Sequence, residues 1–306
     1  MQFIGFKLLS LENRGRAPVE VNPKSFVPSL GRGLMLLEIL VKSRAGLSLS
    51  QATRQLNLPK SSVHCLLRTL EAAGYVYKDK SCGKYRVSLS ICDMARQALQ
   101  GIGLRDQARP ALRKLVACTQ MTVHLAVLEQ RSCVLIEKVT PPGAPRTATW
   151  IGKQLALHCT AVGKALLAHL PEAEVNQLIS EQGFIRYNDN TISSLRQLKQ
   201  ELDLIRSRGY SLDDEEEEIG VRCVGAPIFS PSKEVIAALS IVGETSRISA
   251  ENLPSLGRNV VETASLVSEQ MRDVQLEAGV SLPERTASPH WLRNDSGFIC
   301  APTSAQ

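Results

Sequence analysis

The fold is decided by residues 47–87, which read LSLSQATRQLNLPKSSVHCLLRTLEAAGYVYKDKSCGKYRV. The first part of this stretch predicts two short helices joined by a tight turn at Asn57-Leu58. Ser48 can cap the first helix, Pro59 suits the first turn of the second, and Gly74 is a typical stop after it. Two helices this short and this closely joined must cross at a steep angle.

The second helix of this pair has one apolar face and one polar face. Its apolar positions recur at helical spacing, and they are Val63, Leu66, Leu67 and Leu70. The opposite face carries short donors near the N-terminus and longer cationic side chains behind them, namely Lys60, Ser61, Ser62, His64, Cys65 and Arg68. This arrangement is typical of a helix that enters the major groove of DNA N-terminus first. We therefore predict that these six residues contact double-stranded DNA.

Downstream of the helices the pattern changes from helix to strand. The runs Tyr75-Val76-Tyr77 and Tyr85-Arg86-Val87 flank a turn that contains glycine, which predicts a β-hairpin. The tip of the hairpin is cationic, with Lys78, Lys80 and Lys84, so we expect it to lie beside a phosphate backbone, with Lys84 as a contact. The alternative is that the helix pair belongs to an all-α core and that its cationic side chains are only solvated.

Three further segments carry a family pattern, and they are GRGLMLLEIL at 31–40, LHCTAVGKALLAHL at 157–170 and GYSLDDEEEEIGVRCVGAPIF at 209–229. With the helix pair, they resemble the isocitrate lyase regulator (IclR) family of bacterial transcription factors, in the family's order, over about residues 29–272. The resemblance implies an N-terminal winged helix-turn-helix and a C-terminal GAF-like effector-binding domain. One departure is Cys65, which stands where family members usually carry an arginine, and this bears on the target sequence more than on the function.

The resemblance also implies which residues face a small-molecule effector. Carried over position by position, they are Thr160, Ala161, Asp213, Cys223 and Ser240. The implied ligands are small organic or aromatic acids. Unpaired N–H groups at the start of the helix, just before Gly163, would favour a carboxylate. Asp213 would repel that carboxylate unless Asp213 were protonated or bonded to a ligand hydroxyl, so a hydroxylated acid is the expected effector.

Length and charge indicate two domains with different partners. The chain has 306 residues, which suggests two domains. Residues 1–95 hold 14 Lys and Arg against 6 Asp and Glu, a net charge of +8, so the remainder carries −2 of the total +6. Such uneven charge implies a polyanionic partner for the N-terminal domain only.

Cysteine usage and hydropathy indicate the compartment. The eight cysteines form no CxxC pair and no cluster with histidine at zinc spacing, which fits reduced thiols in a cytosol. The first residues lack the small-residue cleavage site of a signal peptide, and no apolar run reaches the roughly 20 residues that span a membrane. We expect a cytoplasmic protein with no membrane contact, no metal site and no cofactor.

The expected boundaries are a flexible arm over 1–28, the winged helix-turn-helix over 29–88, a linker helix over 89–103, the effector domain over 104–276 and a disordered tail over 277–306. The first helix is expected to bury Leu30, Leu34, Leu37 and Val41, and Pro110 is interpreted as the true start of the helix after the linker. Two hairpins are expected at 123–139 and 221–242, and helices at 163–170, 172–181, 194–208 and 256–271. This alternation predicts a mixed α/β (α+β) fold with a mainly antiparallel sheet.

The linker helix indicates self-association. Its residues Ile91, Met94, Ala95 and Ala98 give it more apolar surface than a lone linker should expose. A single helix-turn-helix makes few base contacts, and two-fold pairing is the usual remedy. We therefore expect a homodimer or homotetramer.

A rival interpretation is a small-molecule-modifying enzyme with a degenerate head. Cys159 beside His158, or Cys223 with His124, would supply a thiol nucleophile and a base. No nucleophile motif surrounds either cysteine, and buried cysteine is usually a small hydrophobe. The acidic run at 213–218 suggests a metal site, but ion-binding loops space their ligands with turn residues, so we interpret the run as solvated. We predict a regulator with no catalytic residue, whose operator binding responds to a metabolite.

Overall fold

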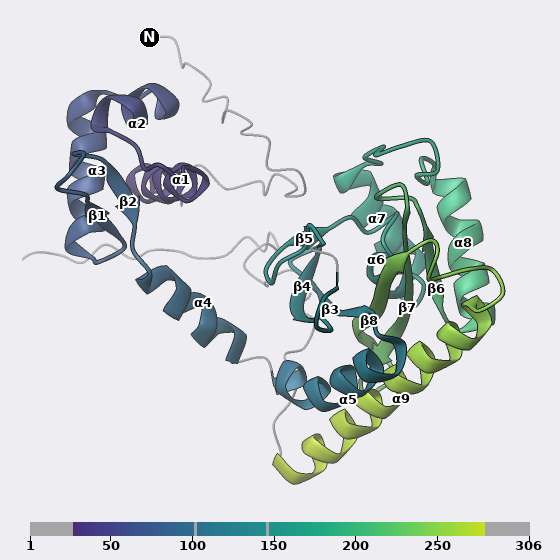
Figure 1. Ribbon diagram of the computed structural model, residues 1–306. Helices are drawn as coiled ribbons and strands as arrows, with labels where there is room; N and C mark the ends of the chain where they lie inside the picture. Colours follow the sequence, from purple (N-terminus) through teal and green to yellow (C-terminus); the bar gives the residue numbers. More distant parts are fainter. Residues whose placement is uncertain (1–26, 101–102, 145–146, 279–306) are drawn as a thin grey trace, which may run out of the picture.

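The computed structural model describes residues 27–100, 103–144 and 147–278, and every structural statement below concerns these residues. Figure 1 shows an N-terminal head and a C-terminal body, with helix α4 (Ser90–Gln100) between them. The predicted arm and tail lie almost entirely outside the described residues.

The head contains three helices and a hairpin, which are α1 (Pro28–Lys42), α2 (Leu49–Leu56), α3 (Lys60–Ala72), β1 (Val76–Lys78) and β2 (Tyr85–Val87). Helix α2 begins with a capping box between Ser48 and Gln51, and it ends at Asn57, whose backbone is left-handed. A β-bridge between Leu47 and Tyr85 attaches the hairpin to the segment before α2. The predicted winged helix-turn-helix is therefore confirmed, and we call the hairpin with its connecting loop 79–84 the wing.

The buried face of α1 differs from the predicted one. Leu30, Leu34 and Val41 are 63%, 54% and 61% exposed, whereas the buried residues are Gly33, Leu36, Ile39 and Leu40. Gly33 lies on this buried face, and a β-carbon there would be in ordinary contact with Leu66 of α3, at 3.9 Å. Helix α1 has apolar residues on more than one face, and its packing against α3 decides which of these faces is buried.

The body is built on one antiparallel sheet of six strands in the order β5-β4-β3-β8-β7-β6. The strands are β3 (Thr122–Glu129), β4 (Ser132–Val139), β5 (Gln154–Leu155), β6 (Ser211–Asp214), β7 (Val221–Phe229) and β8 (Val235–Glu244). Both predicted hairpins form, and the pairing of β3 with β8 joins them into one sheet. The edge strands β5 and β6 were not predicted.

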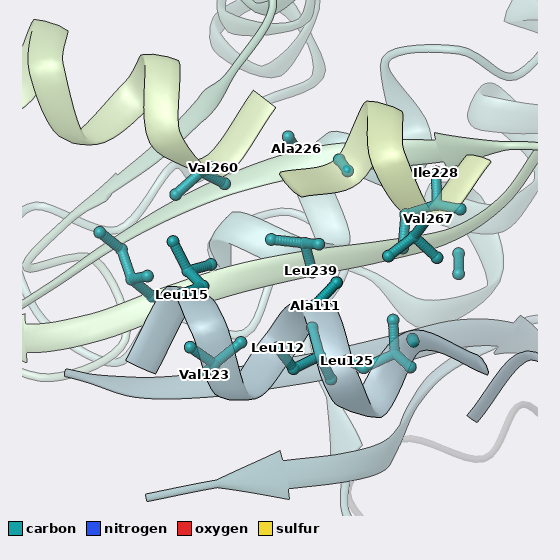
Figure 2. Packing of buried hydrophobic residues seen from close by; sticks show 14 of the residues in the cluster. Ala111, Leu112, Leu115, Val123, Leu125, Ala226, Ile228, Leu239, Val260 and Val267 are labelled. Atoms are coloured by element: carbon teal, nitrogen blue, oxygen red, sulfur yellow. The ribbon is translucent and has the colours of Figure 1, made fainter. Parts of the chain in front are cut away.

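Helices cover both faces of this sheet (Figure 1). One face carries α6 (Ala161–Leu167), α7 (Glu172–Gln182) and α8 (Leu195–Arg208), and the other carries α5 (Gly103–Thr119) and α9 (Leu253–Ala278). Figure 2 shows Leu112 and Leu115 of α5 and Val260 of α9 packed against Leu125 and Leu239 of the sheet. Burial of these side chains from water is the main force that holds the layers together.

Pro110 does not mark the start of the helix after the linker. It lies inside α5, which begins at Gly103, and Leu104 and Ala108 upstream of it are buried. An interior proline costs roughly 3 kcal/mol because it removes a hydrogen bond and crowds the preceding turn. Burial of the apolar face of α5 on both sides of the proline offsets this cost.

Candidate DNA-binding and effector sites

Helix α3 presents its predicted polar face to solvent. Val63 and Leu67 are completely buried, whereas Lys60, Ser61, His64, Cys65 and Arg68 are exposed and Ser62 is half-buried. Among the described residues, no ion pair holds Lys60 or Arg68. The cationic side chains of this helix are therefore free to meet an external partner.

The wing lies beside the helix pair and adds further positive charge. Lys80 is exposed at its tip, and the Lys78 ammonium lies 5.5 Å from the centre of the Tyr85 ring. Lys84 is half-buried, and its β-carbon lies 3.5 Å from where a β-carbon of Gly46 would be. Gly46 has a φ of +69° and such a β-carbon would be only 2.7 Å from the Tyr85 carbonyl oxygen, so only glycine lets the wing approach this closely.

Three of the five predicted effector residues share one face of the sheet. Asp213 pairs with Cys223 across β6 and β7, and Ser240 lies one row away on β8, paired with Gly225 of β7. Because side chains alternate between the faces of a strand, Asp213, Cys223 and Ser240 all point toward the layer that contains α6. The structure therefore brings together residues that are as far apart as 213 and 240 in the sequence.

The remaining two predicted residues lie at the start of α6, against the same face. The Ser211 hydroxyl donates to the Ala161 carbonyl oxygen at 2.7 Å. A β-carbon at Gly225 would lie 3.1 Å from the Ala161 backbone, so the glycine allows the helix to approach the sheet. Thr160 precedes Ala161 and is 4% exposed. All five predicted effector residues thus border one region between α6 and the sheet.

One backbone amide in the first turn of α6 is bonded within the chain. The Thr160 hydroxyl oxygen accepts from the Gly163 amide at 3.1 Å, and the same hydroxyl donates to the Ala156 carbonyl oxygen at 2.6 Å. The Gly163 N–H is therefore already bonded within the chain. Thr160 acts as the N-cap of α6, a role that its position in the sequence allows but does not require.

The acidic run at 213–218 is not simply solvated, contrary to our interpretation. Asp213 and Glu216 are 2% and 6% exposed. The Asp213 carboxylate accepts from the Glu216 amide at 2.8 Å. Burial raises the pKa of Asp213 from 3.8 to about 7, because a charged carboxylate is poorly stabilised away from water. The Asp213 side chain is therefore partly protonated and partly ionised near neutral pH.

A buried lysine that the sequence analysis missed explains why the acidic run folds inward. Lys164 of α6 is 1% exposed and forms an ion pair with Glu216, and its ammonium lies 3.8 Å from the Glu201 carboxylate. Glu201 is also bonded to Arg208 at 2.6 Å. Burial raises the pKa of Glu216, and the Lys164 ammonium opposes this effect. The signal available in the sequence was one cation within the apolar run AVGKALL.

A second polar group adjoins Ser240, and the sequence analysis considered it only as a catalytic base. His124 of β3 is the cross-strand partner of Ser240, and its Nε2 atom lies 3.0 Å from the Thr149 hydroxyl. The Lys138 ammonium donates to the Thr149 carbonyl oxygen at 2.9 Å. Burial, with the nearby Lys138 and Lys153 charges, lowers the pKa of His124 to about 3. The imidazole is therefore neutral at physiological pH.

The geometry gives no support to a thiol enzyme. His158 Nε2 lies 3.0 Å from the Ile185 carbonyl oxygen, and the His158 ring packs edge-on against Phe184. Burial raises the pKa of both Cys159 and Cys223 well above the ordinary value for a thiol, so neither forms a thiolate readily. Within the described ranges, no three His, Cys, Asp or Glu side chains are grouped as a metal would need. The same ranges contain no helix that is long and apolar enough to cross a membrane.

Two hollows in the described part of the chain are lined by residues other than the five predicted effector residues. One, of about 240 Å³, lies between the end of α8 and α9 and is lined by Arg208, Tyr210, Gly257, Arg258, Val261 and Glu262. The other, of about 40 Å³, adjoins His158 and Tyr187.

An exposed polar helix beside a basic wing, followed by a sheet domain with buried polar groups, is the arrangement expected of a DNA-binding transcriptional regulator with an effector-binding C-terminal domain. Residues 29–80 match the IclR helix-turn-helix domain, and residues 96–269 match the C-terminal domain of bacterial transcriptional regulators of the IclR type. The chain belongs to the IclR family.

Relatives of this family resemble the chain over most of its length. The acetate operon repressor of Salmonella typhimurium is 36% identical over 259 residues, which are 83% of this chain and 94% of the repressor. The crystal structure of Thermotoga maritima IclR is 30% identical with a TM-score of 0.69, covering 80% of this chain and 98% of that one. An IclR homologue from Microbacterium hydrocarbonoxydans, complexed with 4-hydroxybenzoate, has the same fold at 23% identity, with a TM-score of 0.69 over 80% of this chain and 99% of that one.

Proposed function

We propose that the DNA interface consists of the exposed face of α3 and one residue of the wing, namely Lys60, Ser61, Ser62, His64, Cys65, Arg68 and Lys84. The observation that supports it is the division of α3, which buries Val63 and Leu67 and leaves the polar residues outward. Short hydroxyl side chains near the N-terminus suit close approach to base edges, and Arg68, about two turns farther along the helix, can reach a base or a phosphate.

Replacement of Ser62 and Arg68 tests this interface. A duplex of the intergenic DNA upstream of the gene serves as the probe, and a bidentate base contact is worth roughly 1–3 kcal/mol, whereas a phosphate contact changes the salt slope by about one. We expect Arg68→Ala to weaken binding, and a salt titration identifies which kind of contact was lost. Arg113→Ala removes an exposed cation from α5 and is the matched control. Wild-type affinity in Ser62→Ala, Arg68→Ala and the double variant would refute the interface.

We infer that the effector is a small hydroxylated organic or aromatic acid, bound by Thr160, Ala161, Asp213, Cys223 and Ser240. Asp213, Cys223 and Ser240 point from the sheet toward α6, and a protonated Asp213 can donate to a ligand where an ionised one would repel it. The Microbacterium homologue of the same fold holds 4-hydroxybenzoate, a ligand of this chemical class. If the effector binds more tightly, by about 1–3 kcal/mol, to one arrangement of the DNA-binding heads than to another, its binding suffices to change the affinity for the operator.

Calorimetry with a panel of hydroxylated and unsubstituted acids, including 4-hydroxybenzoate, tests this site. Asp213→Ala and Ser240→Ala should weaken binding, whereas Asp214→Ala changes a carboxylate that lies outside the buried cluster and should not. The proposed site is wrong if an acid that releases the protein from DNA binds both Asp213→Ala and Ser240→Ala with wild-type affinity.

We further infer a homodimer or homotetramer that acts in the cytoplasm without catalysis. The support for self-association is apolar exposure at the linker and on α1, where Leu89 just before α4 is 82% exposed, Met94 of α4 is 55% exposed and Leu34 of α1 is 54% exposed. We retain head, linker and body boundaries of 29–88, 89–103 and 104–276. Light scattering of the wild type and of Leu34→Asp and Met94→Asp measures the assembly, and a monomeric wild type would contradict it.

A further inference from the structure

The loop of the wing carries an acidic residue among its lysines. Asp79 lies between Lys78 and Lys80, at the end of the hairpin that we propose to lie beside DNA. A carboxylate in this position repels phosphates, so charge alone predicts that removing it would tighten DNA binding. The contacts of Asp79 point to the opposite result.

Asp79 forms hydrogen bonds within the wing loop through both its side chain and its backbone. Its Oδ1 atom accepts from the Ser81 amide at 2.9 Å and from the Ser81 hydroxyl at 2.6 Å. Its amide donates to the Lys84 carbonyl oxygen at 2.8 Å, and its carbonyl oxygen accepts from the Gly83 amide at 2.8 Å. The hydrogen bonds from Ser81 are the main reason that the pKa of Asp79 falls to about 2, so the carboxylate is charged throughout the physiological range.

The second oxygen of Asp79 ties the wing to the helix pair. Asp79 Oδ2 lies 3.3 Å from Nε of Arg86 on β2. The same guanidinium donates from Nη1 to the Arg44 carbonyl oxygen, between α1 and α2, at 3.4 Å. Backbone hydrogen bonds of 3.0 and 2.8 Å between Leu47 and Tyr85 run beside this connection. The orientation of the wing relative to the helix pair thus depends in part on one carboxylate.

We propose that Asp79 is the positioning residue of the wing. By holding loop 79–84 in one shape and engaging Arg86, it presents Lys80 and Lys84 to the DNA backbone in register with α3. This role rests on the proposed DNA interface and adds Lys80 to it as a second contact from the wing. A loop that is ordered before binding loses less conformational entropy on the DNA, which outweighs the repulsion from one carboxylate.

Asp79→Ala in the full-length protein tests the proposal, because charge and positioning predict opposite signs. Affinity is measured by fluorescence anisotropy over a range of salt concentrations, on the upstream intergenic duplex and on a scrambled duplex. Loss of the contacts of two lysines should weaken binding about tenfold at fixed salt and reduce the salt slope by about two. Glu71→Gln removes the same charge near the end of α3, and it should bind as tightly as the wild type or more tightly.

Asp79→Ala in a Lys80→Ala/Lys84→Ala background distinguishes a role of Asp79 in positioning these two lysines from a general role in the structure of the protein. If Asp79 acts through these lysines, Asp79→Ala has no further effect there, whereas a full effect in that background overturns the proposal. Asp79→Ala that binds as tightly as the wild type with an unchanged slope also overturns it. Wild-type affinity in the double-lysine variant would show instead that the proposed wing contact is wrong.

Thermal unfolding shows whether Asp79→Ala still folds. If it does not, Ser81→Ala decides, because it removes only the hydroxyl that donates to Asp79 and leaves the backbone hydrogen bond in place. A weaker affinity and a smaller salt slope for Ser81→Ala support the proposal, and wild-type values for both overturn it.

Discussion

Replacing Asp213 with asparagine should stabilise the protein at pH 8 and have little effect near pH 4. Asp213 is 2% exposed, and burial raises its pKa from 3.8 to about 7. The folded state thus holds a proton that the unfolded state releases above pH 3.8, so folding becomes less favourable as the pH rises from 3.8 to about 7. Above pH 7 the cost is constant, and asparagine avoids it because it carries no charge.

The size of this effect follows from the two pKa values. A change from 3.8 to about 7, at about 1.36 kcal/mol per pKa unit, corresponds to about 4 kcal/mol at pH 8, as an upper bound. The Glu216 amide that bonds to Asp213 keeps an acceptor, because an asparagine oxygen can take the place of the carboxylate oxygen.

Urea denaturation followed by circular dichroism measures this difference at fixed protein concentration, at unit steps from pH 4 to pH 8. Asp214→Asn is the matched control, because the Asp214 side chain is 53% exposed and pairs with Arg222 at the surface. The reasoning is refuted if the stability difference between wild type and Asp213→Asn does not change with pH, or if the variant is the less stable protein at pH 8.

Three further substitutions test the DNA-binding face of α3 and the packing of α6. Cys65→Arg should tighten DNA binding in anisotropy measurements, because a guanidinium adds hydrogen-bond donors to an exposed position of α3. If a folded variant loses binding instead, Cys65 packs closely against the DNA and leaves no room for a longer side chain. Lys164→Met should destabilise the protein by about 3–5 kcal/mol in urea denaturation, since it leaves Glu216 buried without its partner. The double variant Lys164→Met/Glu216→Leu should recover much of the loss, and a single variant as stable as the wild type would contradict this. Gly163→Ala should lower the free energy of unfolding by about 1–3 kcal/mol in the same assay, because its β-carbon would lie 2.5 Å from the Ala156 carbonyl oxygen. An unchanged unfolding midpoint would show that α6 can shift to make room.

Elements with a strong local pattern were predicted closely. The end of α8 follows from Gly209, which has a φ of +84°, and its start follows from Ser194, whose hydroxyl accepts from the Gln197 amide. The tight turn after α2 and the hairpins β3–β4 and β7–β8 were likewise found from turn residues and alternation. These features depend on residues a few positions apart, so a single sequence contains the information.

The sequence by itself determined the head, the two hairpins and the polar face of α3, because each depends on local periodicity and turn chemistry. Only the tertiary structure decided that α1 buries Leu36 rather than Leu34, and that Lys164 meets Glu216 from 52 positions away. Burial of a charge depends on a partner that the fold brings from a distant segment, and an acidic run gives no local sign of which carboxylates will face inward. Asp213 therefore has a pKa near 7 because of where β6 places it against the layer that contains α6.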